Sequence, residues 1–349
     1  MKHILLALLM ASSVQAFAKA SESVWTKGFV QVRPNQRLYV EQRKAAPGRP
    51  TLLLCNGLTW STEQWQPLVK ALDVIDPTIG IVLYDMEGMG KTLLDKAPIT
   101  FDIPFENQVR DLKSLHDTLN IQGPVILGGL SYGGGLAIQY MAEHPGDFDK
   151  MLLMAPYLEP LPTQDQWIRQ QVAITRAANP LNPYSDDQLY DFFLRQLVYT
   201  TYPILEPIML ENPYKTEGVY RMVKGAKNWH AANVVKNLPA GKLHVMAGSQ
   251  DPYVSLDSQK QFWNSVAPNV RQSFIIVSQT QHELPKDRPD YTAAWVLQVV
   301  DNNPELNKGL TFDGDPLKFT ATSGSVVIPL GAGVQSCDND LLRKISQTR

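Results

Sequence analysis

The sequence contains little cysteine and no excess of charge of either sign. Only Cys55 and Cys337 occur among its 349 residues, so no framework of disulfides holds the fold together. A bond between the two is chemically allowed in an oxidising compartment, but nothing in the sequence brings them together. The 32 basic and 34 acidic residues give a net charge of −2, which provides no electrostatic basis for binding nucleic acid.

Long hydrophobic runs are also absent, and the longest apolar stretch near the start is too short to span a bilayer. There, Met1-Lys2-His3 carries positive charge, Ile4–Met10 is apolar, and Ala16-Phe17-Ala18 has the small-x-small form of a cleavage site. This pattern is typical of a secretory signal peptide. We expect residues 1–18 to be removed, leaving a periplasmic or secreted chain that begins near Lys19 and has no stable membrane anchor.

Short apolar runs alternate with amphipathic helical patterns in two parts of the chain, residues 25–156 and 241–305. This alternation predicts an α/β fold with a mostly parallel sheet flanked by helices. Gly28–Val32 and Leu38–Gln42 predict a hairpin at the sheet edge. The remaining predicted strands are Thr51–Cys55, Gly80–Tyr84, Val125–Leu127, Lys150–Met154, Leu243–Ala247 and Ser273–Val277. Predicted helices cover Thr62–Leu72, Phe105–Leu119, Leu136–His144, Leu256–Val266 and Asp290–Val300.

The segment 157–240 between these two parts has a different pattern. It is rich in prolines and aromatic residues, and its apolar residues recur at helical spacing. We interpret it as a helical lid over the sheet, with a minority of its aromatic side chains lining an apolar pocket. Residues 306–349 form a C-terminal extension with the pattern of a hairpin around Val326.

The stretch Gly129-Leu130-Ser131-Tyr132-Gly133 is the strongest functional motif. It matches G-x-S-x-G, it follows an apolar strand and it precedes a helix. Such a tight turn strains the backbone of the serine and leaves no room for side chains on its neighbours. The serine hydroxyl then lies at a helix N-terminus, where amide groups favour developing negative charge. We therefore predict Ser131 as a nucleophile.

A serine nucleophile needs a base, and the base needs an acid to orient it. Of the six histidines, only His282 follows the end of a predicted strand and precedes a helix, on the side of a parallel sheet where ligands bind. Asp251 follows another strand end, and the order Ser131, Asp251, His282 is the order of the hydrolases with this motif. Two other acids are alternatives to Asp251, namely Asp257 and Asp287.

Two backbone N–H groups are needed to bind the oxyanion of an acyl-transfer intermediate. The residue after the nucleophile, Tyr132, supplies one. The other comes from the turn that follows strand Thr51–Cys55, with Leu58 as the first choice and Thr59 as the alternative.

Four motifs together resemble the α/β-hydrolase fold family in its lid-bearing, serine-hydrolase form, over roughly residues 29–300. They are Asn56-Gly57-Leu58 with Trp65, the turn from Asp85 to Thr92, the serine turn, and Gly248-x-x-Asp251-Pro252 with His282. Asn56 stands where the family usually has histidine, and Gln281 where it has glycine. The resemblance implies catalysis by Ser131, Asp251 and His282.

The expected function is cleavage of an ester or related acyl bond in a small, apolar or acyl substrate, with no metal or cofactor. An exported aminopeptidase of the proline iminopeptidase type is the alternative. It needs acidic lid residues to hold the substrate amine, for which the candidates are Glu206, Glu211 and Glu217. A third possibility is a non-catalytic binding protein on a hydrolase scaffold. The sequence specifies neither the substrate nor an oligomeric state.

Overall fold

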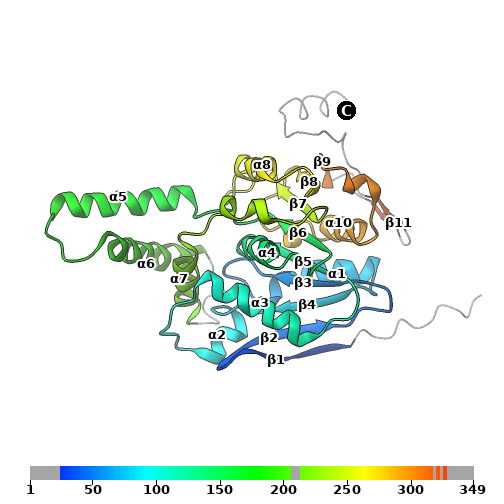
Figure 1. Ribbon diagram of the computed structural model, residues 1–349, viewed down its shortest axis with the longest axis horizontal. Coiled ribbons are helices and arrows are strands. Elements are labelled where there is room, and N and C mark those ends of the chain that lie inside the picture. The colour runs from blue at the N-terminus through cyan, green and yellow to red at the C-terminus, as the bar shows by residue number, and fades with distance from the viewer. Residues whose placement is uncertain (1–23, 206–212, 317–319, 323–324, 328–349) are drawn as a thin grey trace, which may run out of the picture.

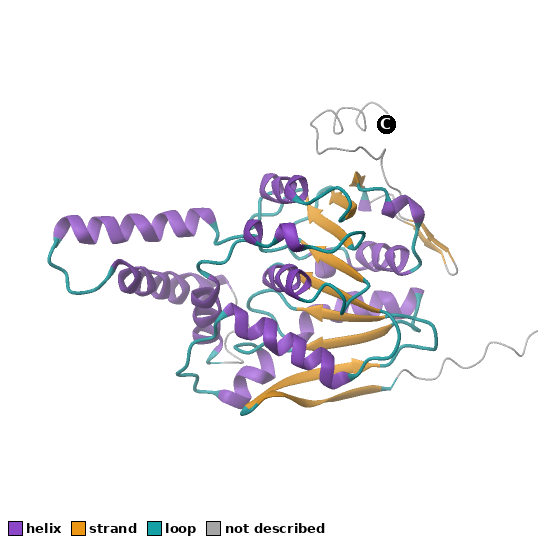
Figure 2. Ribbon diagram, viewed as in Figure 1, coloured by secondary structure: helices purple, strands orange, loops and turns teal. Residues whose placement is uncertain are grey.

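A nine-stranded sheet forms the centre of the protein, and helices cover both of its faces (Figures 1 and 2). The computed structural model describes residues 24–205, 213–316, 320–322 and 325–327. The strand order is β1-β2-β4-β3-β5-β6-β7-β8-β9. β1 and β2 pair antiparallel, as do β2 and β4, and all other neighbours pair parallel. The predicted fold class, a mostly parallel sheet flanked by helices, is confirmed.

The strands follow one another along the chain as β1 (Trp25–Arg33), β2 (Gln36–Arg43), β3 (Thr51–Cys55), β4 (Gly80–Tyr84), β5 (Val125–Leu130), β6 (Lys150–Met154), β7 (Leu243–Gly248), β8 (Arg271–Val277), β9 (Leu310–Gly314), β10 (Thr320–Thr322) and β11 (Ser325–Val327). The α-helices are α1 (Gln66–Ile75), α2 (Gly90–Lys96), α3 (Phe105–Leu119), α4 (Tyr132–Glu143), α5 (Pro162–Ala178), α6 (Asp186–Leu205), α7 (Lys215–Ala226), α8 (Leu256–Ser265), α9 (Leu284–Asp287) and α10 (Pro289–Val300). Short 3₁₀ helices are η1 (Thr62–Trp65), η3 (Ala231–Asn233), η4 (Val235–Asn237) and η5 (Pro304–Asn307).

Continuous apolar strands arise because both faces of the sheet are buried. Along β3, Leu53 and Cys55 pack into the core shared with α3 and α4, while Leu52 and Leu54 pack into the core shared with α1 and α10. Every residue of β3 is buried. This alternation explains why the sequence predicted the strand without showing a polar face.

The N-terminal hairpin, β1 with β2, lies at one edge of the sheet as predicted. At the opposite edge the sheet continues past residue 305, where the sequence predicted the core to end, because β9 pairs in parallel with β8. The sequence of β9, Leu-Thr-Phe-Asp-Gly, lacks a continuous apolar run, and among the described strands β9 has a neighbour on one side only. Beyond it, β10 and β11 pair antiparallel as a short hairpin.

The predicted helix Thr62–Leu72 is divided in the structure. Ser61 caps a 3₁₀ turn, η1, by accepting a hydrogen bond from the amide of Glu63. The α-helix α1 then begins at Gln66 and continues to Ile75, with Pro67 in its first turn. A proline is tolerated there because the first amide groups of a helix have no intrahelical partner.

Helices α5, α6 and α7 follow β6 and precede β7. Figure 1 shows α5 and α6 projecting side by side away from the sheet. Aromatic residues of this segment do not all form its core, since Tyr184 and Phe192 are exposed. None of the helices in the described part of the chain combines the length and apolar character needed to cross a membrane. Cys337 and the predicted signal peptide lie outside the described residues.

Candidate active site

Ser131 occupies the turn between β5 and α4 with a strained backbone. Its φ of 51° and ψ of −119° lie in a region that L-residues rarely adopt. Its carbonyl oxygen accepts hydrogen bonds from the amides of Gly134 and Tyr157, both at 2.8 Å, and its amide donates to Met154. These bonds hold the strained turn, which places the Cβ atom of the serine at the start of α4.

Two glycines of the motif are required by close packing. A Cβ atom at position 129 would collide with the carbonyl oxygen of Gly133, and a Cβ at position 133 would collide with that of Cys55. The start of α4 therefore packs directly against the ends of β3 and β5. This agrees with the crowding that the sequence motif predicted.

His282 and Asp251 meet at the carboxyl ends of neighbouring strands, β8 and β7. The Nδ1 atom of His282 lies 2.7 Å from Oδ2 of Asp251, and both side chains are buried. The other carboxylate oxygen, Oδ1, accepts hydrogen bonds from the amides of Tyr253 at 2.8 Å and Val254 at 3.0 Å. An ionised carboxylate can only accept a hydrogen bond, so Nδ1 of His282 carries the proton and donates it to Asp251. This leaves Nε2 as the basic atom of the imidazole.

The two turns that carry these residues pack against each other. The amide of Gln250 donates to the carbonyl of Thr280 at 3.0 Å, and a Cβ at Gly248 would collide with the carbonyl of Gln281. Gln281, which replaces the usual glycine, has an exposed side chain and does not disturb this contact. The alternatives Asp257 and Asp287 lie exposed on α8 and α9, whereas Asp251 contacts the histidine.

The loop Gly57–Trp60 follows β3 and carries the predicted oxyanion donor Leu58. Thr59 has a φ of 77°, a left-handed conformation that costs free energy for a branched side chain. Asn56, which replaces the usual histidine, is fully buried and satisfied. Its amide nitrogen donates to the carbonyl of Tyr84 at 2.9 Å, and its oxygen accepts from the indole of Trp65 at 2.7 Å. This departure therefore anchors the base of the loop.

A second set of contacts on this loop comes from Glu283, which sequence reasoning missed. Its carboxylate accepts hydrogen bonds from the Trp60 indole at 3.1 Å and from the Gln64 amide at 3.0 Å. Its position directly after His282 is the only signal that could have drawn attention to it. Nearby, Asp85 accepts from the amides of Thr62 and Lys91, and its burial raises its pKa to about 6.

One pocket brings these elements together. Ser131, His282, Leu58 and Tyr132 all line it, and so does Thr59. Helices α5, α6 and α7 and the segment before α5 contribute a largely apolar wall, made of Tyr157, Leu161, Ile168, Leu194 and Val223. The pocket holds about 210 Å³ of free space. Such a site fits a substrate with an apolar portion beside the serine.

The far wall of the pocket includes one anionic group, Asp165 of α5. Its two oxygens accept hydrogen bonds from the Tyr190 hydroxyl at 2.8 Å and from Arg169 at 2.7 Å. Burial disfavours its ionisation, but the hydrogen bonds from Arg169 and Tyr190 together with the positive charge nearby lower the pKa of Asp165. The carboxylate is therefore ionised at neutral pH and faces the pocket.

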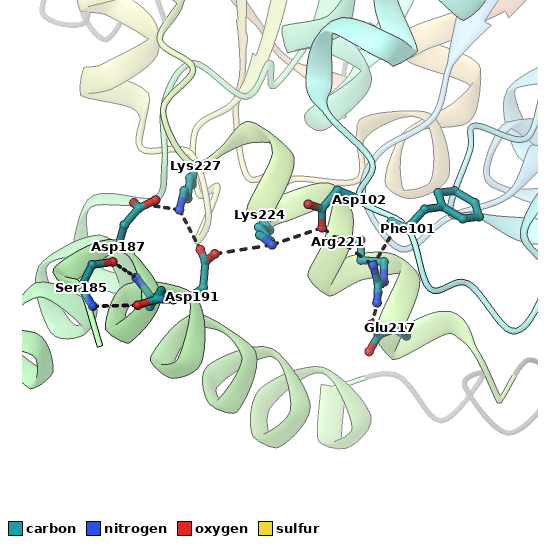
Figure 3. Close-up of polar contacts among 10 residues, drawn as sticks. Phe101, Asp102, Ser185, Asp187, Asp191, Glu217, Arg221, Lys224 and Lys227 are labelled. Atoms are coloured by element: carbon teal, nitrogen blue, oxygen red, sulfur yellow. Dashed lines mark hydrogen bonds and ion pairs between the residues drawn. The ribbon is translucent and has the colours of Figure 1, made fainter. Parts of the chain in front are cut away.

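Glu217, a predicted amine-binding residue, does not line this pocket. It lies in a series of ion pairs that joins α6 to α7 and α7 to the segment before α3 (Figure 3). Arg221, one turn further along α7, donates to Glu217 at 2.7 Å and to the carbonyl of Phe101 at 2.5 Å. Arg195 lies 3.1 Å from the same carboxylate. The sequence interpretation failed for Glu217 because these arginines neutralise it, while Glu206 and Glu211 lie outside the described residues.

The same series of ion pairs fixes one pocket residue, Lys227. Its ammonium group donates to Asp191 at 2.7 Å and to Asp187 at 3.0 Å, both on α6. Lys224 then connects Asp191 to Asp102, so that charges tie α6, α7 and the sheet domain together (Figure 3). Within the described residues, no group of three or more His, Cys, Asp or Glu side chains is arranged to hold a metal ion.

Comparison with known proteins identifies the family. A family model described as serine aminopeptidase, S33, matches residues 46–289. Monoacylglycerol lipase abhd6-B of Xenopus laevis is 23% identical over 283 residues, which cover 74% of this chain and 80% of that protein. A Mycoplasma genitalium protein provisionally named a proline iminopeptidase is 33% identical over 136 residues, covering 38% of this chain and 41% of that protein. The chain spans 40–44% of the length of three of its curated relatives.

Among solved structures, MGS-M2, an α/β-hydrolase enzyme from a Medee basin deep-sea metagenome library, superposes with a TM-score of 0.59 at 16% identity. The match covers 79% of this chain and 98% of that one. At this identity the likeness shows the fold alone, and the family model adds the family. The chain belongs to the serine aminopeptidase family S33 and has the α/β-hydrolase fold.

Proposed function

We propose that the protein hydrolyses an ester or a related acyl bond through an acyl-enzyme on Ser131. The observation that carries this proposal is the hydrogen bond of 2.7 Å between Asp251 and His282, since His282 lines the same pocket as Ser131. Asp251 holds the imidazole with its proton on Nδ1, which leaves Nε2 free to accept the proton of the serine hydroxyl.

In the first step, Oγ of Ser131 attacks the acyl carbon while Nε2 of His282 takes its proton. The amides of Tyr132 and Leu58 donate hydrogen bonds to the negative oxygen that forms. When the bond to the leaving group breaks, His282 returns the proton to that group. A water molecule then attacks the acyl-serine with His282 as base, which releases the acid and restores Ser131.

The apolar wall of the pocket supports an acyl chain as the bound portion of the substrate. Because α5, α6 and α7 supply most of this wall, the segment 157–240 is the lid in this proposal, and the ion pairs of α6 and α7 hold it in place. Replacement of the lid by a homologous one is expected to change which substrates are accepted while the triad stays the same.

An aminopeptidase is the second candidate, and one observation favours it. Asp165 places an ionised carboxylate on the pocket wall, where it could pair with a substrate ammonium group. Its two existing hydrogen bonds already satisfy part of its charge, and Glu217 is occupied by arginines. Ester hydrolysis needs no such anchor, so it is the simpler account of a largely apolar site.

Export is part of the proposal and rests on the charged, apolar and Ala-x-Ala pattern at residues 1–18. The hydrolase of this proposal works on a small-molecule substrate in the periplasm or outside the cell.

A panel of substrates tests the activity. Purified protein is assayed with p-nitrophenyl esters of short and long acyl chains and with aminoacyl p-nitroanilides, beside Ser131→Ala. Turnover of esters that disappears in the variant supports the proposal, and turnover of the anilides alone supports the aminopeptidase. Turnover that is equal in wild type and Ser131→Ala contradicts both.

A further inference from the structure

We propose that Glu283 is a positioning residue that holds the loop Gly57–Trp60 in the conformation that binds the oxyanion. This inference rests on the proposed function, since it takes the amide of Leu58 as an oxyanion donor. Glu283 belongs to the turn of the catalytic base, and the loop that it contacts lies more than 200 residues earlier in the chain.

The carboxylate holds one end of the loop directly. Oε1 of Glu283 accepts the indole N–H of Trp60 at 3.1 Å. Trp60 is half-buried, and the ammonium groups of Lys286 and Lys215 lie 5.0 Å and 5.9 Å from its ring centroid. The indole N–H is therefore held by a carboxylate, and two ammonium groups lie against the face of the ring.

The other end of the loop is held through Gln64. Oε2 of Glu283 accepts from the amide nitrogen of Gln64 at 3.0 Å. The oxygen of the same amide accepts the backbone N–H of Gly57 at 2.7 Å. Gln64 is buried, so its amide cannot exchange these partners for water. Leu58 thus lies between two residues that are both connected to Glu283.

Two features of the loop's backbone are ones that side-chain anchors would stabilise. Its internal hydrogen bond, from the amide of Trp60 to the carbonyl of Gly57, is long at 3.4 Å. Thr59 has a φ of 77°, which a threonine adopts only when its surroundings enforce it. An oxyanion donor must stay within about 2.7–3.1 Å of the developing charge to be effective. Loss of an anchor is expected to move Leu58 out of this range.

An ionised carboxylate is the group that fits these partners. The amide of Gly57 is a donor and requires the oxygen of Gln64, which turns the NH₂ group of Gln64 towards Glu283. The indole of Trp60 is also a donor. Glu283 therefore faces two donors and accepts from both.

The titratable groups nearest Glu283 are His282 and Lys286, and the ammonium group of Lys215 on α7 lies 5.9 Å from the ring of Trp60. Burial raises the pKa of Glu283, and the hydrogen bonds from Gln64 and Trp60 and the nearby Lys286 act in the opposite direction.

The first test is Glu283→Gln, which keeps the size of the side chain. The amide introduced there has one acceptor and one donor group, so one of the two contacts becomes a clash of donors. The expected result is a fall in kcat of roughly 10- to 100-fold, with KM within about threefold of wild type. The second-order rate of labelling by a fluorophosphonate probe should fall by a similar factor.

The second test exchanges the two groups in the double variant Gln64→Glu/Glu283→Gln. The carboxylate now at position 64 accepts from the amide of Gly57 and from the NH₂ group now at position 283. The amide oxygen at position 283 accepts from the indole of Trp60, so all three hydrogen bonds return. Both kcat and the labelling rate should recover to within about threefold of wild type. Glu63→Gln, an exposed neighbour on η1, is the matched control and should behave as wild type.

Four results would overturn the inference. Glu283→Gln could keep the wild-type kcat, or it could change only KM. The double variant could be no more active than Glu283→Gln, or the control Glu63→Gln could lose as much kcat as Glu283→Gln. If Glu283→Gln fails to fold in a thermal melt, Trp60→Phe, which removes the indole N–H with its five-membered ring and keeps an aromatic side chain, should lower the labelling rate about tenfold, and an unchanged rate is contrary. Absence of labelling in wild type contradicts the proposed function as well, whereas equal labelling of wild type and Glu283→Gln contradicts only the role of Glu283.

Discussion

Replacement of Asp251 by asparagine changes one atom of the predicted triad and leaves its packing intact. The backbone amides of Tyr253 and Val254 both donate to Oδ1, so the asparagine oxygen must take that position. The NH₂ group of the asparagine then faces Nδ1 of His282, 2.7 Å away in the wild type, and can only donate to it. Nδ1 becomes an acceptor and the proton moves to Nε2. In that tautomer His282 cannot take the proton of Ser131.

The expected loss in kcat is roughly 10⁴-fold, which corresponds to about 5.4 kcal/mol of transition-state stabilisation. It is measured with the ester on which wild type is most active, together with fluorophosphonate labelling of Ser131, and thermal melts should show that the fold persists. Asp257→Asn, an exposed substitution on α8, is the control and should keep wild-type turnover. The reasoning is refuted if Asp251→Asn stays within tenfold of wild type, or if Asp257→Asn or Asp287→Asn shows the loss instead.

Three other predictions concern stability, reactivity and export. Burial lowers the pKa of His244 to about 3, so the unfolded chain binds a proton that the folded one does not, and stability falls as the pH drops from about 6.5 towards 3, by up to about 1.4 kcal/mol per pH unit. Urea unfolding of His244→Val/Ser273→Ala, which removes the buried pair, should show a shallower acid slope than wild type, and equal slopes would contradict this origin. Burial also raises the pKa of the Cys55 thiol to about 12. In a Cys337→Ser variant, a disulfide reagent should therefore react with one thiol after unfolding and with none in the native protein. Rapid reaction of the native protein would disprove this prediction. N-terminal sequencing of protein from the host should begin near Lys19, and an intact Met1 would count against export.

The core strands could be predicted from the sequence because burial on both faces leaves a continuous apolar run. Thr51–Cys55, Gly80–Tyr84 and Lys150–Met154 have the predicted bounds in the structure. The edge strand β9 was missed because one-sided pairing allows Thr and Asp in its sequence. The serine turn was predictable because side chains at positions 129 and 133 would collide with the neighbouring backbone. Glycine is therefore required at both positions, and this requirement is visible in a five-residue motif.

Contacts between distant loops could not be predicted in this way. The sequence placed Asp251 and His282 at strand ends, and the structure brings them into contact, but nothing in either segment indicated that Glu283 reaches Gln64 and Trp60. A glutamate beside a catalytic histidine has the same sequence signal whether it faces solvent, substrate or another loop. Only the packed arrangement of the two strand ends distinguishes these cases.

The turn after β8 therefore connects two parts of the proposed chemistry. On one side of the turn, Asp251 orients the imidazole of His282. On the other side, Glu283 holds the loop Gly57–Trp60. Because His282 and Glu283 are successive residues of one turn, a shift of this turn would move both of them together relative to Ser131. The contacts of Gln250 with Thr280 and of Gly248 with Gln281 restrain the turn from the neighbouring strand. A larger residue at position 248 would collide with the carbonyls of Thr280 and Gln281 and should consequently impair proton transfer and oxyanion binding together.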